Sequence, residues 1–175
     1  MKVTVECIRQ LNNHPAPHLI SVVRCLETCL QKILFALEIQ DKWPLVSSEG
    51  VWCEAKGNGY RLVNAPFFIK GLAYGDVFEA TLDPVNEHVF EFKVIEQSGH
   101  SLVWLLNNSN LDITSFKNSL LALGCSIEGF EQFRIYSIDV PLSVDTTQIN
   151  ELIDATEQEG VDFAFPVWRH DDERT

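Results

Sequence analysis

The stretch that most constrains this fold runs from residue 64 to residue 80 and reads NAPFFIKGLAYGDVFEA. Pro66 fixes its own φ angle and disfavours helical geometry in the residue before it. The bulky run at 67–69 is β-prone, whereas Gly71 and Gly75 suit positions that need a positive φ angle or a close backbone approach. The stretch therefore predicts a sharply bent, well-packed segment whose role is architectural.

Composition bounds the class of protein. The 175 residues are 46% hydrophobic, which is enough for the core of one domain or of two small domains packed together. No apolar run approaches the roughly 18 residues that span a bilayer, and residues 1–7 lack the apolar segment of a signal peptide. Five cysteines without a disulfide-like spacing indicate free thiols in a reducing compartment. We therefore expect a cytoplasmic protein that does not enter a membrane.

The chain is acidic, with a formal net charge of −12 and 13 Lys and Arg residues. The basic residues are scattered, whereas contact with a nucleic-acid backbone requires them in clusters, so no nucleic-acid partner is expected. Acidity by itself indicates solubility, and its more specific interpretation is a basic protein partner. Acidic side chains are dense towards the end of the chain, at Glu157, Glu159, Asp162, Asp171, Asp172 and Glu173.

The order of hydrophobic patterns predicts an α+β fold in one compact unit. Residues 1–31 are predicted to form an N-terminal extension, with a strand at 2–8 and an amphipathic helix at 18–31. Residues 32–98 predict a β-rich subdomain, either a small curled β-sheet or a partly open barrel, because short alternating runs are separated by turns. Its strands are expected from about 33 to 40 and at 51–55, 60–63, 77–80 and 88–96, with a hairpin loop at 56–59.

Residues 99–168 predict a ferredoxin-like subdomain, because the patterns follow the strand–helix–strand–strand–helix–strand order of the split βαβ fold. Polar side chains before each helix and a glycine after it are typical capping signals. The strands are expected at 101–106, 125–128, 133–140 and 161–167, and the helices between Asn110 or Asp112 and Gly124 and between Asp145 and Gly160. Residues 169–175 form a charged tail that is expected to fray.

Several motifs, taken in this order, resemble a bacterial family known as domain of unknown function 4265. They are residues 49–54 (EGVWCE), 59–62 (GYRL), 64–68 (NAPFF), 71–77 (GLAYGDV), 98–101 (SGHS), 123–128 (LGCSIE) and 139–141 (DVP). The likeness covers roughly residues 33 to 165, and the first thirty-odd residues lie outside it. The family is a grouping without an assigned activity, so the resemblance implies no cofactor, catalytic residue or mechanism.

The junction between the two halves holds the candidate site. His100 lies in a Ser-Gly-His-Ser motif, and histidine side chains titrate near neutrality and can act as acid or base. Asp76 follows a glycine turn and could orient His100, while Tyr74 and Ser98 would complete a pocket. The alternative is structural, with His100 bonded to backbone at the start of a strand and Asp76 capping a turn.

Three other patterns have simpler interpretations. Cys125 follows a helix C-terminus, where the dipole disfavours a thiolate nucleophile, so a buried structural thiol is expected. Cys25 and Cys29 could reach one metal ion, but His18 lies about 10 Å away along a helix, too far for one tetrahedral site. The Gly-Asn-Gly at 57–59 is not followed by the residues of a phosphate loop. We therefore expect neither a metal nor a cofactor.

Two functions follow from these patterns. The first is a non-catalytic cytoplasmic binding protein whose acidic surface engages a basic protein, with neutralisation of a basic nuclease toxin as one concrete form. The second is a small-molecule binder or enzyme with a site at the junction, at Tyr74, Asp76, Ser98 and His100. A cavity in which these four residues converge would favour the second function. The patterns leave the oligomeric state open.

Overall fold

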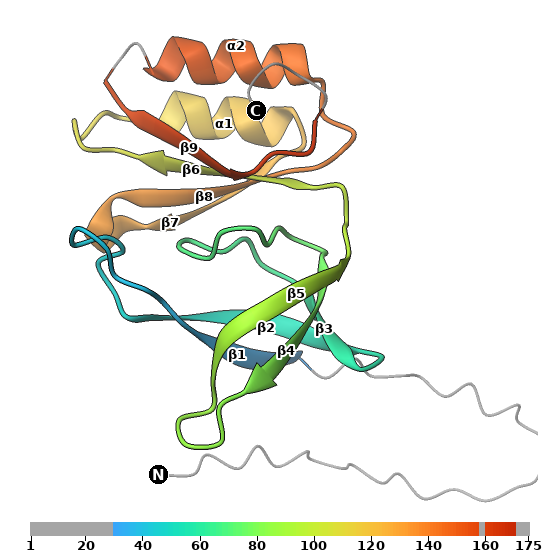
Figure 1. Ribbon diagram of the computed structural model, residues 1–175. Helices are drawn as coiled ribbons and strands as arrows, with labels where there is room; N and C mark the ends of the chain where they lie inside the picture. The colour runs from blue at the N-terminus through green and yellow to red at the C-terminus, as the bar shows by residue number, and fades with distance from the viewer. Residues whose placement is uncertain (1–29, 158–159, 171–175) are drawn as a thin grey trace, which may run out of the picture.

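The computed structural model describes residues 30–157 and 160–170. Two β layers face each other, a barrel and a four-stranded sheet, and two helices cover the face of the sheet that points away from the barrel (Figure 1). The chain completes the barrel before it enters the sheet. The strand predicted at 2–8, the helix predicted up to residue 29 and the tail beyond residue 170 lie outside the described residues.

The first half is a closed barrel with the strand order β1-β2-β3-β4-β5. Its strands are β1 (Leu30–Ala36), β2 (Ser48–Lys56), β3 (Gly59–Leu62), β4 (Val77–Leu82) and β5 (His88–Glu96). Consecutive strands pair antiparallel, and a short parallel pairing of β1 with β5 closes the barrel. The barrel is closed, so the prediction of a partly open barrel is wrong. The closure could not be predicted, because a pairing between the first and last strands leaves no signal in the local alternation of apolar and polar residues.

The start of β1 also differs from the prediction. Leu30 and Gln31, expected to end a helix, begin β1 and pair with β2, and the strand ends at Ala36. Every residue of β1 has a partner in β2, so strand pairing overrides the helical spacing of apolar side chains at this point.

Aromatic rings fill the barrel. Phe35, Phe78 and Phe92 pack against one another with ring centroids 5.6, 5.6 and 6.0 Å apart. Such separations are typical of tilted and edge-to-face packing. Burial of a phenylalanine side chain stabilises a fold by roughly 1.5–3 kcal/mol, so the interior of the barrel is a major source of stability for this half.

The second half is an antiparallel sheet with the strand order β7-β8-β6-β9. Its elements are β6 (Ser101–Leu106), α1 (Thr114–Ala122), β7 (Ser126–Phe130), the 3-10 turn η1 (Glu131–Phe133), β8 (Ile135–Val140), α2 (Thr146–Glu157) and β9 (Asp162–Val167). The predicted α+β class is confirmed. β8 begins later than predicted, because η1 and the left-handed Arg134, with φ 54°, precede it.

Two aspartates fix the helix starts. Asp112 Oδ1 accepts a hydrogen bond from the Thr114 N–H at 3.0 Å, and Asp145 Oδ1 accepts one from the Thr147 N–H at 2.8 Å. Such bonds satisfy N–H groups that a helix leaves without internal partners. Of the two candidates for the first helix start, Asp112 rather than Asn110 therefore supplies the bond.

The loop between β3 and β4, residues 63–76, lies between the two layers and is called the seam loop below (Figure 1). Its bulky run at 67–69 forms no strand, although its residue types are β-prone. Glu49 explains this, since its carboxylate accepts hydrogen bonds from the N–H groups of Phe67 and Phe68 at 2.7 and 2.8 Å. Buried backbone groups need partners, and here a side chain takes the place of a neighbouring strand.

The seam loop also bonds to the sheet. The carbonyl of Pro66 accepts hydrogen bonds from Trp104 Nε1 and Ser137 Oγ, both at 2.8 Å. Gly71 and Gly75 have φ angles of 78° and 79°, so the positive φ predicted for both is confirmed and allows the loop to turn twice between the layers. The stretch that most constrained the sequence is thus the element that joins the two halves.

Candidate functional site

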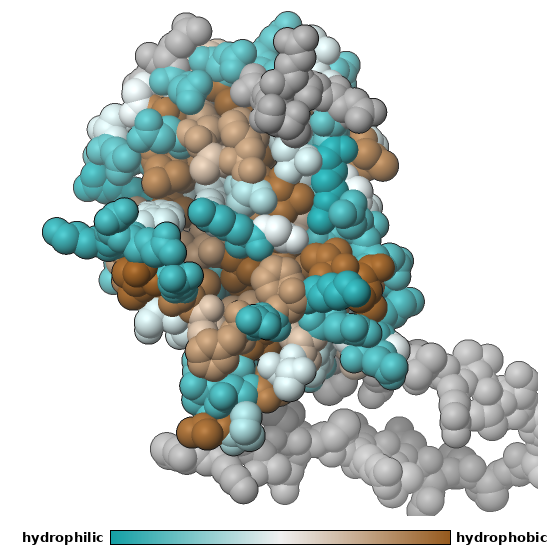
Figure 2. Space-filling model, in the orientation of Figure 1, coloured by the Kyte–Doolittle hydropathy of each residue, from teal (hydrophilic) through white to brown (hydrophobic). Residues whose placement is uncertain are grey.

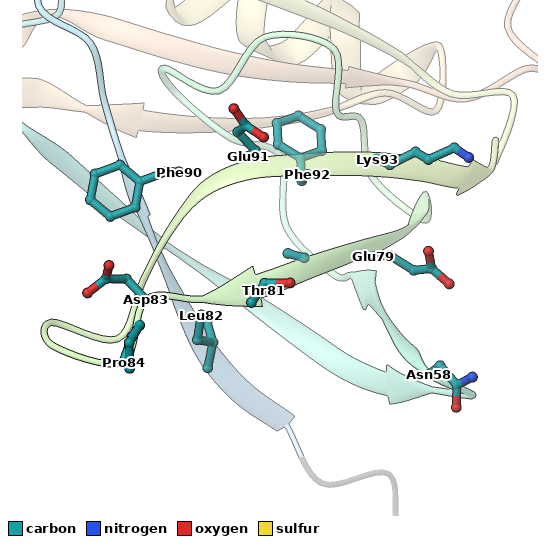
Figure 3. Close-up of a pocket in the computed structure, with 11 residues that line it drawn as sticks. Asn58, Glu79, Thr81, Leu82, Asp83, Pro84, Phe90, Glu91, Phe92 and Lys93 are labelled. Atoms are coloured by element: carbon teal, nitrogen blue, oxygen red, sulfur yellow. The ribbon is translucent and has the colours of Figure 1, made fainter.

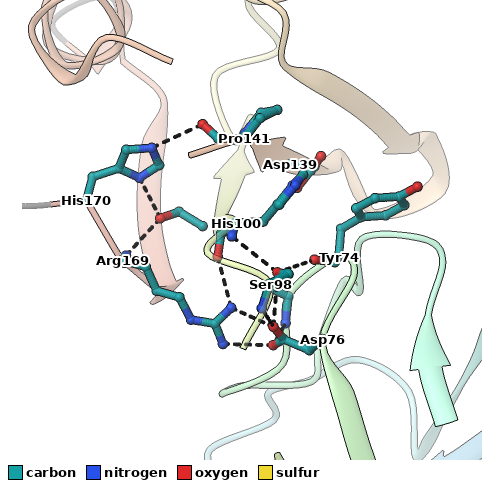
Figure 4. Close-up of polar contacts among 10 residues, drawn as sticks. Tyr74, Asp76, Ser98, His100, Asp139, Pro141, Arg169 and His170 are labelled. Carbon is teal, nitrogen blue, oxygen red and sulfur yellow. Dashed lines mark hydrogen bonds and ion pairs between the residues drawn. The ribbon is translucent and has the colours of Figure 1, made fainter. Parts of the chain in front are cut away.

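Asp76, at the end of the seam loop, makes polar contacts with Arg169 and Ser98 (Figure 4). Its carboxylate is fully buried. Arg169, just after β9, donates two hydrogen bonds to it, from Nη1 to Oδ1 and from Nη2 to Oδ2, both at 2.7 Å. The N–H groups of Ala73 and Ser98 donate to the same carboxylate at 2.8 and 2.9 Å. We call Asp76, Ser98 and Arg169 the clamp, because they tie the seam loop to both ends of the sheet half.

The electrostatics of the clamp favour a permanently ionised Asp76. Burial alone raises the pKa of this carboxyl, but the Arg169 guanidinium and the N–H groups of Ser98 and Ala73 outweigh burial and hold the pKa below its usual range. Both carboxylate oxygens are engaged within the chain. Asp76 is therefore equipped to hold the seam closed and has no lone pair directed at a substrate.

Ser98 is a structural link within the clamp. Its hydroxyl lies 2.6 Å from the Tyr74 carbonyl and 3.0 Å from Asp76 Oδ1, and it accepts a hydrogen bond from the His100 N–H at 3.2 Å. A hydroxyl with these acceptors and this donor is committed to the local backbone. Ser98 thus positions the segment between β5 and β6 and is not arranged as a nucleophile.

His100 pairs with Asp139, a residue of β8. The Nδ1 of His100 lies 2.7 Å from Asp139 Oδ1, and the two side chains are 24% and 8% exposed. Burial raises the pKa of Asp139, and the contact with His100 offsets part of that rise. The prediction that Asp76 orients His100 is therefore wrong, because the carboxylate of Asp76 binds Arg169 while Asp139 takes the position beside the imidazole.

The exposed side of His100 defines what this pair can do chemically. The Tyr74 ring packs against the imidazole with a centroid separation of 5.3 Å. Within residues 30–157 and 160–170, Nε2 of His100 has no hydrogen-bond partner. A carboxylate on one ring nitrogen orients the imidazole and leaves the other nitrogen able to accept or donate a proton.

The residues after β9 are anchored. Arg169 N–H donates to Ser101 Oγ at 2.8 Å, and the buried His170 places Nδ1 2.8 Å from the same oxygen. The Nε2 of His170 lies 3.2 Å from the Pro141 carbonyl. The expectation that the chain frays from Arg169 onward is thus wrong for its first two residues, because both have partners in the sheet half.

The four predicted site residues therefore do meet. Tyr74, Asp76, Ser98 and His100 contact one another through hydrogen bonds and a ring contact. However, the fully buried Asp76 and the engaged Ser98 serve the clamp, whereas the side chains of His100 and Tyr74 are partly open to solvent. None of the four lines the groove described next.

A second region of the seam is a groove of about 840 Å³ between the barrel and β7. We call it the seam groove, and its lining includes Lys32, Glu49, Trp52, Phe67, Glu128 and Phe130. Trp52 is 48% exposed, and the rings of Phe67 and Phe130 meet at 5.8 Å across the seam. On the face drawn in Figure 2, hydrophobic side chains gather at the level where the two layers meet. Among the described residues, the groove thus leaves part of its aromatic surface exposed.

Charged groups in the seam groove are less fully engaged than those in the clamp. Burial raises the pKa of Glu49, although the N–H groups of Phe67, Phe68 and Ile69 act against the rise. Burial also raises the pKa of Glu128, and no cation is paired with it among the described residues. The Lys32 Nζ lies 5.9 Å from the centroid of the Trp52 ring. Glu128 is therefore a carboxylate whose charge lacks a partner within the described chain.

A further open cavity of about 740 Å³ lies on the hairpin of β4 and β5 (Figure 3). It is lined by residues of both strands and of the turn between them, including Glu79, Phe90 and Lys93, and by Asn58 of the β2–β3 hairpin. Phe90 is 61% exposed. This cavity belongs to the barrel alone and contains none of the predicted site residues.

Among residues 30–157 and 160–170, no group of three His, Cys, Asp or Glu side chains is arranged to hold a metal ion. The set His18, Cys25 and Cys29 lies outside the described residues. Burial, with a contribution from Asp139, raises the pKa of the Cys125 thiol to about 12, which disfavours a thiolate nucleophile. No helix in the described part of the chain is long and apolar enough to cross a membrane.

Sequence reasoning missed two residues for different reasons. Asp139 stands in the buried, otherwise mostly apolar strand 135–140, and a carboxylate in such a strand signals a buried partner. That signal was available in the sequence. Arg169 follows the last strand as one of several charged residues, and nothing local distinguishes it from its solvated neighbours.

Comparisons with known proteins give a family and a fold. The model of a family described as a domain of unknown function (DUF4265) matches residues 49–163. A solved structure titled as a hypothetical protein from Neisseria gonorrhoeae superposes with a TM-score of 0.61 at 13% identity, over 78% of this chain and 95% of that one. No curated protein matches the chain. The likeness to the solved structure supports the arrangement of the two layers.

Proposed function

Because the chain belongs to the family of domain of unknown function 4265, which carries no assigned activity, we propose its function from its own geometry. The protein is a non-catalytic binding protein that engages a basic protein through an acidic surface at the seam. The observation that carries this proposal is the seam groove, where the half-exposed Trp52 lies together with Glu128, whose charge has no cationic partner among the described residues. Aromatic side chains and unpaired charges are features of surfaces that bind proteins.

The overall charge supports the same proposal. A net charge of −12 attracts a basic partner over several ångströms and accelerates its association. Neutralisation of a basic nuclease toxin is one concrete form of this function, since a tight complex with an acidic inhibitor would cover the nucleic-acid site of such an enzyme.

The test measures binding of the full chain to purified basic proteins, secreted nuclease toxins among them, at about 50 and 300 mM salt. We expect a stoichiometric complex whose association rate falls as salt rises. Glu128→Lys should weaken it at least about tenfold, or roughly 1.4 kcal/mol. The matched control is Glu91→Lys, an exposed position on the barrel, which should change affinity less than about twofold. Equal effects of the two variants, or no complex with any basic protein, would contradict the proposal.

A second candidate function is a small-molecule binder or enzyme at the junction. It is favoured by the His100–Asp139 pair and by Nε2 of His100, which has no hydrogen-bond partner within the described chain. Its test compares His100→Ala and Asp139→Asn with the wild type in hydrolase assays on ester and phosphoester substrates. General acid–base catalysis would be lost by about 10²–10⁴-fold in His100→Ala, measured at a temperature where this variant, which leaves the buried Asp139 without its partner, is still fully folded. Wild-type rates no higher than buffer would dismiss this candidate.

Two finer features belong to the same proposal. The strand order β7-β8-β6-β9 and the connection order from β6 to β9 support a ferredoxin-like assignment for the second half. The buried free thiols of Cys53 and Cys125 support a cytoplasmic location in a bacterium. Titration of accessible thiols before and after unfolding tests whether Cys53 and Cys125 are free and buried, in which case both should react only after unfolding.

A further inference from the structure

β7 is an edge strand. It pairs with β8 on one side, and no strand of the described residues lies beyond it. In an antiparallel ladder every second residue turns its N–H and C=O groups away from the partner strand. Within residues 30–157 and 160–170, these outward groups of β7 make no hydrogen bond. With respect to the described chain, β7 therefore presents a row of free donors and acceptors, which is the feature that allows another chain to add as a strand.

The opposite edge, β9, is protected. Pro166 has no N–H group, and its carbonyl accepts a hydrogen bond from the Gly71 N–H at 3.4 Å. The register of β9 against β6 also shifts between Leu102 and Trp104. Edge prolines and irregular register discourage strand addition. By contrast, Ser126–Phe130 contains no proline and pairs with β8 residue by residue.

The barrel-facing side chains of β7 line the seam groove. Glu128 lies opposite Ser137 in the ladder, and opposite residues of an antiparallel pair share a face. That face points towards the barrel, because Ser137 bonds to the Pro66 carbonyl. Phe130 lies two residues after Glu128 on the same face and contacts Phe67. A strand added to β7 would therefore place alternate side chains at the groove.

The chemistry of the groove selects for a cation. Glu128 offers a carboxylate without a cationic partner among the described residues, and Trp52 offers an exposed aromatic face across the groove. Arginine and lysine bind carboxylates and also pack over tryptophan rings. Lys32 already lies near the Trp52 ring, so the cation of a partner is best placed at the Glu128 end.

We propose that β7 receives an extended segment of a basic protein as a fifth strand of the sheet, with an arginine or lysine of that segment against Glu128 in the seam groove. The five residues of β7 span about 17 Å, which matches a segment of five to seven residues. This inference rests on the proposed function and specifies the segment, strand and groove that carry it.

The experiment titrates the isotope-labelled full chain with seven-residue peptides in which arginine or lysine alternates with valine, and follows backbone amide resonances. Three controls are matched to the parts of the proposal. Peptides with glutamate in place of the basic residues test charge, peptides N-methylated on alternate amides test main-chain pairing, and the variants Glu128→Gln and Glu91→Gln test position.

We expect the largest shifts at Ser126–Phe130, slower exchange of the outward amides of β7, and about tenfold weaker binding to Glu128→Gln than to Glu91→Gln. The glutamate and N-methylated peptides should leave β7 unchanged. The inference is overturned if no basic peptide shifts the resonances of β7. It is also overturned if β7 contacts residues 1–29 in the free chain, or if a concentration-dependent dimer pairs β7 with its copy. If a basic protein binds elsewhere, the proposed function survives without this inference, and if none binds, both fail.

Discussion

The clamp and the seam groove lie on the same seam and differ in how far their charges are engaged. In the clamp, the buried carboxylate of Asp76 has a guanidinium and two backbone N–H groups as partners. In the groove, the carboxylate of Glu128 has no cationic partner within the described chain, and Trp52 is half exposed.

This difference separates the structural part of the seam from the part available to a partner. Charges that are satisfied internally hold the layers together and are costly to disturb, because removal of one partner leaves the other buried and unpaired. Charges without internal partners contribute little to stability and are free to bind a ligand. Variants of the two regions should therefore affect different measurements.

The largest effect is expected from Arg169→Ala. It leaves the fully buried Asp76 without its cation, and loss of one member of a buried pair typically lowers the free energy of unfolding by about 3–5 kcal/mol. Urea denaturation measures it. A loss below about 1 kcal/mol would mean that Asp76 finds water or another partner, and the clamp would no longer differ from the groove.

The second largest loss of stability is expected from Glu49→Ala, which tests whether Glu49 belongs with the structural residues of the clamp or with the binding residues of the groove. Glu49 lines the seam groove, yet its carboxylate serves the N–H groups of Phe67 and Phe68. Their loss leaves two donors unsatisfied, which costs about 2–3 kcal/mol of unfolding free energy. Glu49→Gln, which keeps one acceptor oxygen, is the matched control and should lose about half as much. Equal stability of all three proteins would place Glu49 with Glu128 as a binding residue.

A smaller effect is expected from pH, with opposite signs in the two regions. The pKa of Asp76 is lowered on folding, so its contribution to stability is complete above the unfolded-state value near 3.9 and is lost as pH falls through the folded value. The stability advantage of the wild type over Asp76→Asn should therefore shrink only in acid. The raised pKa of Glu128 gives the reverse, a stability that falls as pH rises from its unfolded to its folded value. Denaturation at a series of pH values, with Asp76→Asn and Glu128→Gln beside the wild type, checks both signs.

The smallest effect is expected from Glu128→Gln at neutral pH. The variant removes a charge that partial desolvation disfavours, so stability should rise. The side chain is still largely exposed to solvent, which limits the gain to roughly 0.5 kcal/mol. Thermal unfolding measures this gain, while affinity for basic peptides should fall. A clear loss of stability would mean that Glu128 has a partner within the chain, and Glu128 would then be a structural residue like Asp76.

Local patterns predicted the regular elements of this fold. β5 at 88–96 and β6 at 101–106 have the predicted bounds, because alternation and flanking turns are both encoded in short windows. Closure of the barrel was missed, since the pairing of Phe35 with Val89 depends on how the intervening strands curve. The run at 67–69 was misleading for a related reason: bulky side chains favour strands on average, whereas here Glu49 supplies the partners of the backbone.

The candidate site was predicted in its location and not in its pairing. The sequence placed Tyr74, Asp76, Ser98 and His100 at the junction, and the structure brings them into contact. The partners that decide their chemistry come from distant positions, since Asp76 and Arg169 are 93 residues apart and His100 and Asp139 are 39 apart. A single sequence carries no signal that matches one charged residue with another across such separations.

The position of the Pro66 carbonyl has a consequence for how this protein can be divided or recombined. Trp104 and Ser137 share that oxygen, and Asp76 of the same loop requires Arg169. Each layer therefore completes hydrogen bonds that begin in the other, and neither could be transplanted to another protein as a module. A chimera of two relatives would keep these hydrogen bonds only if the seam loop and its partners Trp104, Ser137 and Arg169 came from the same parent.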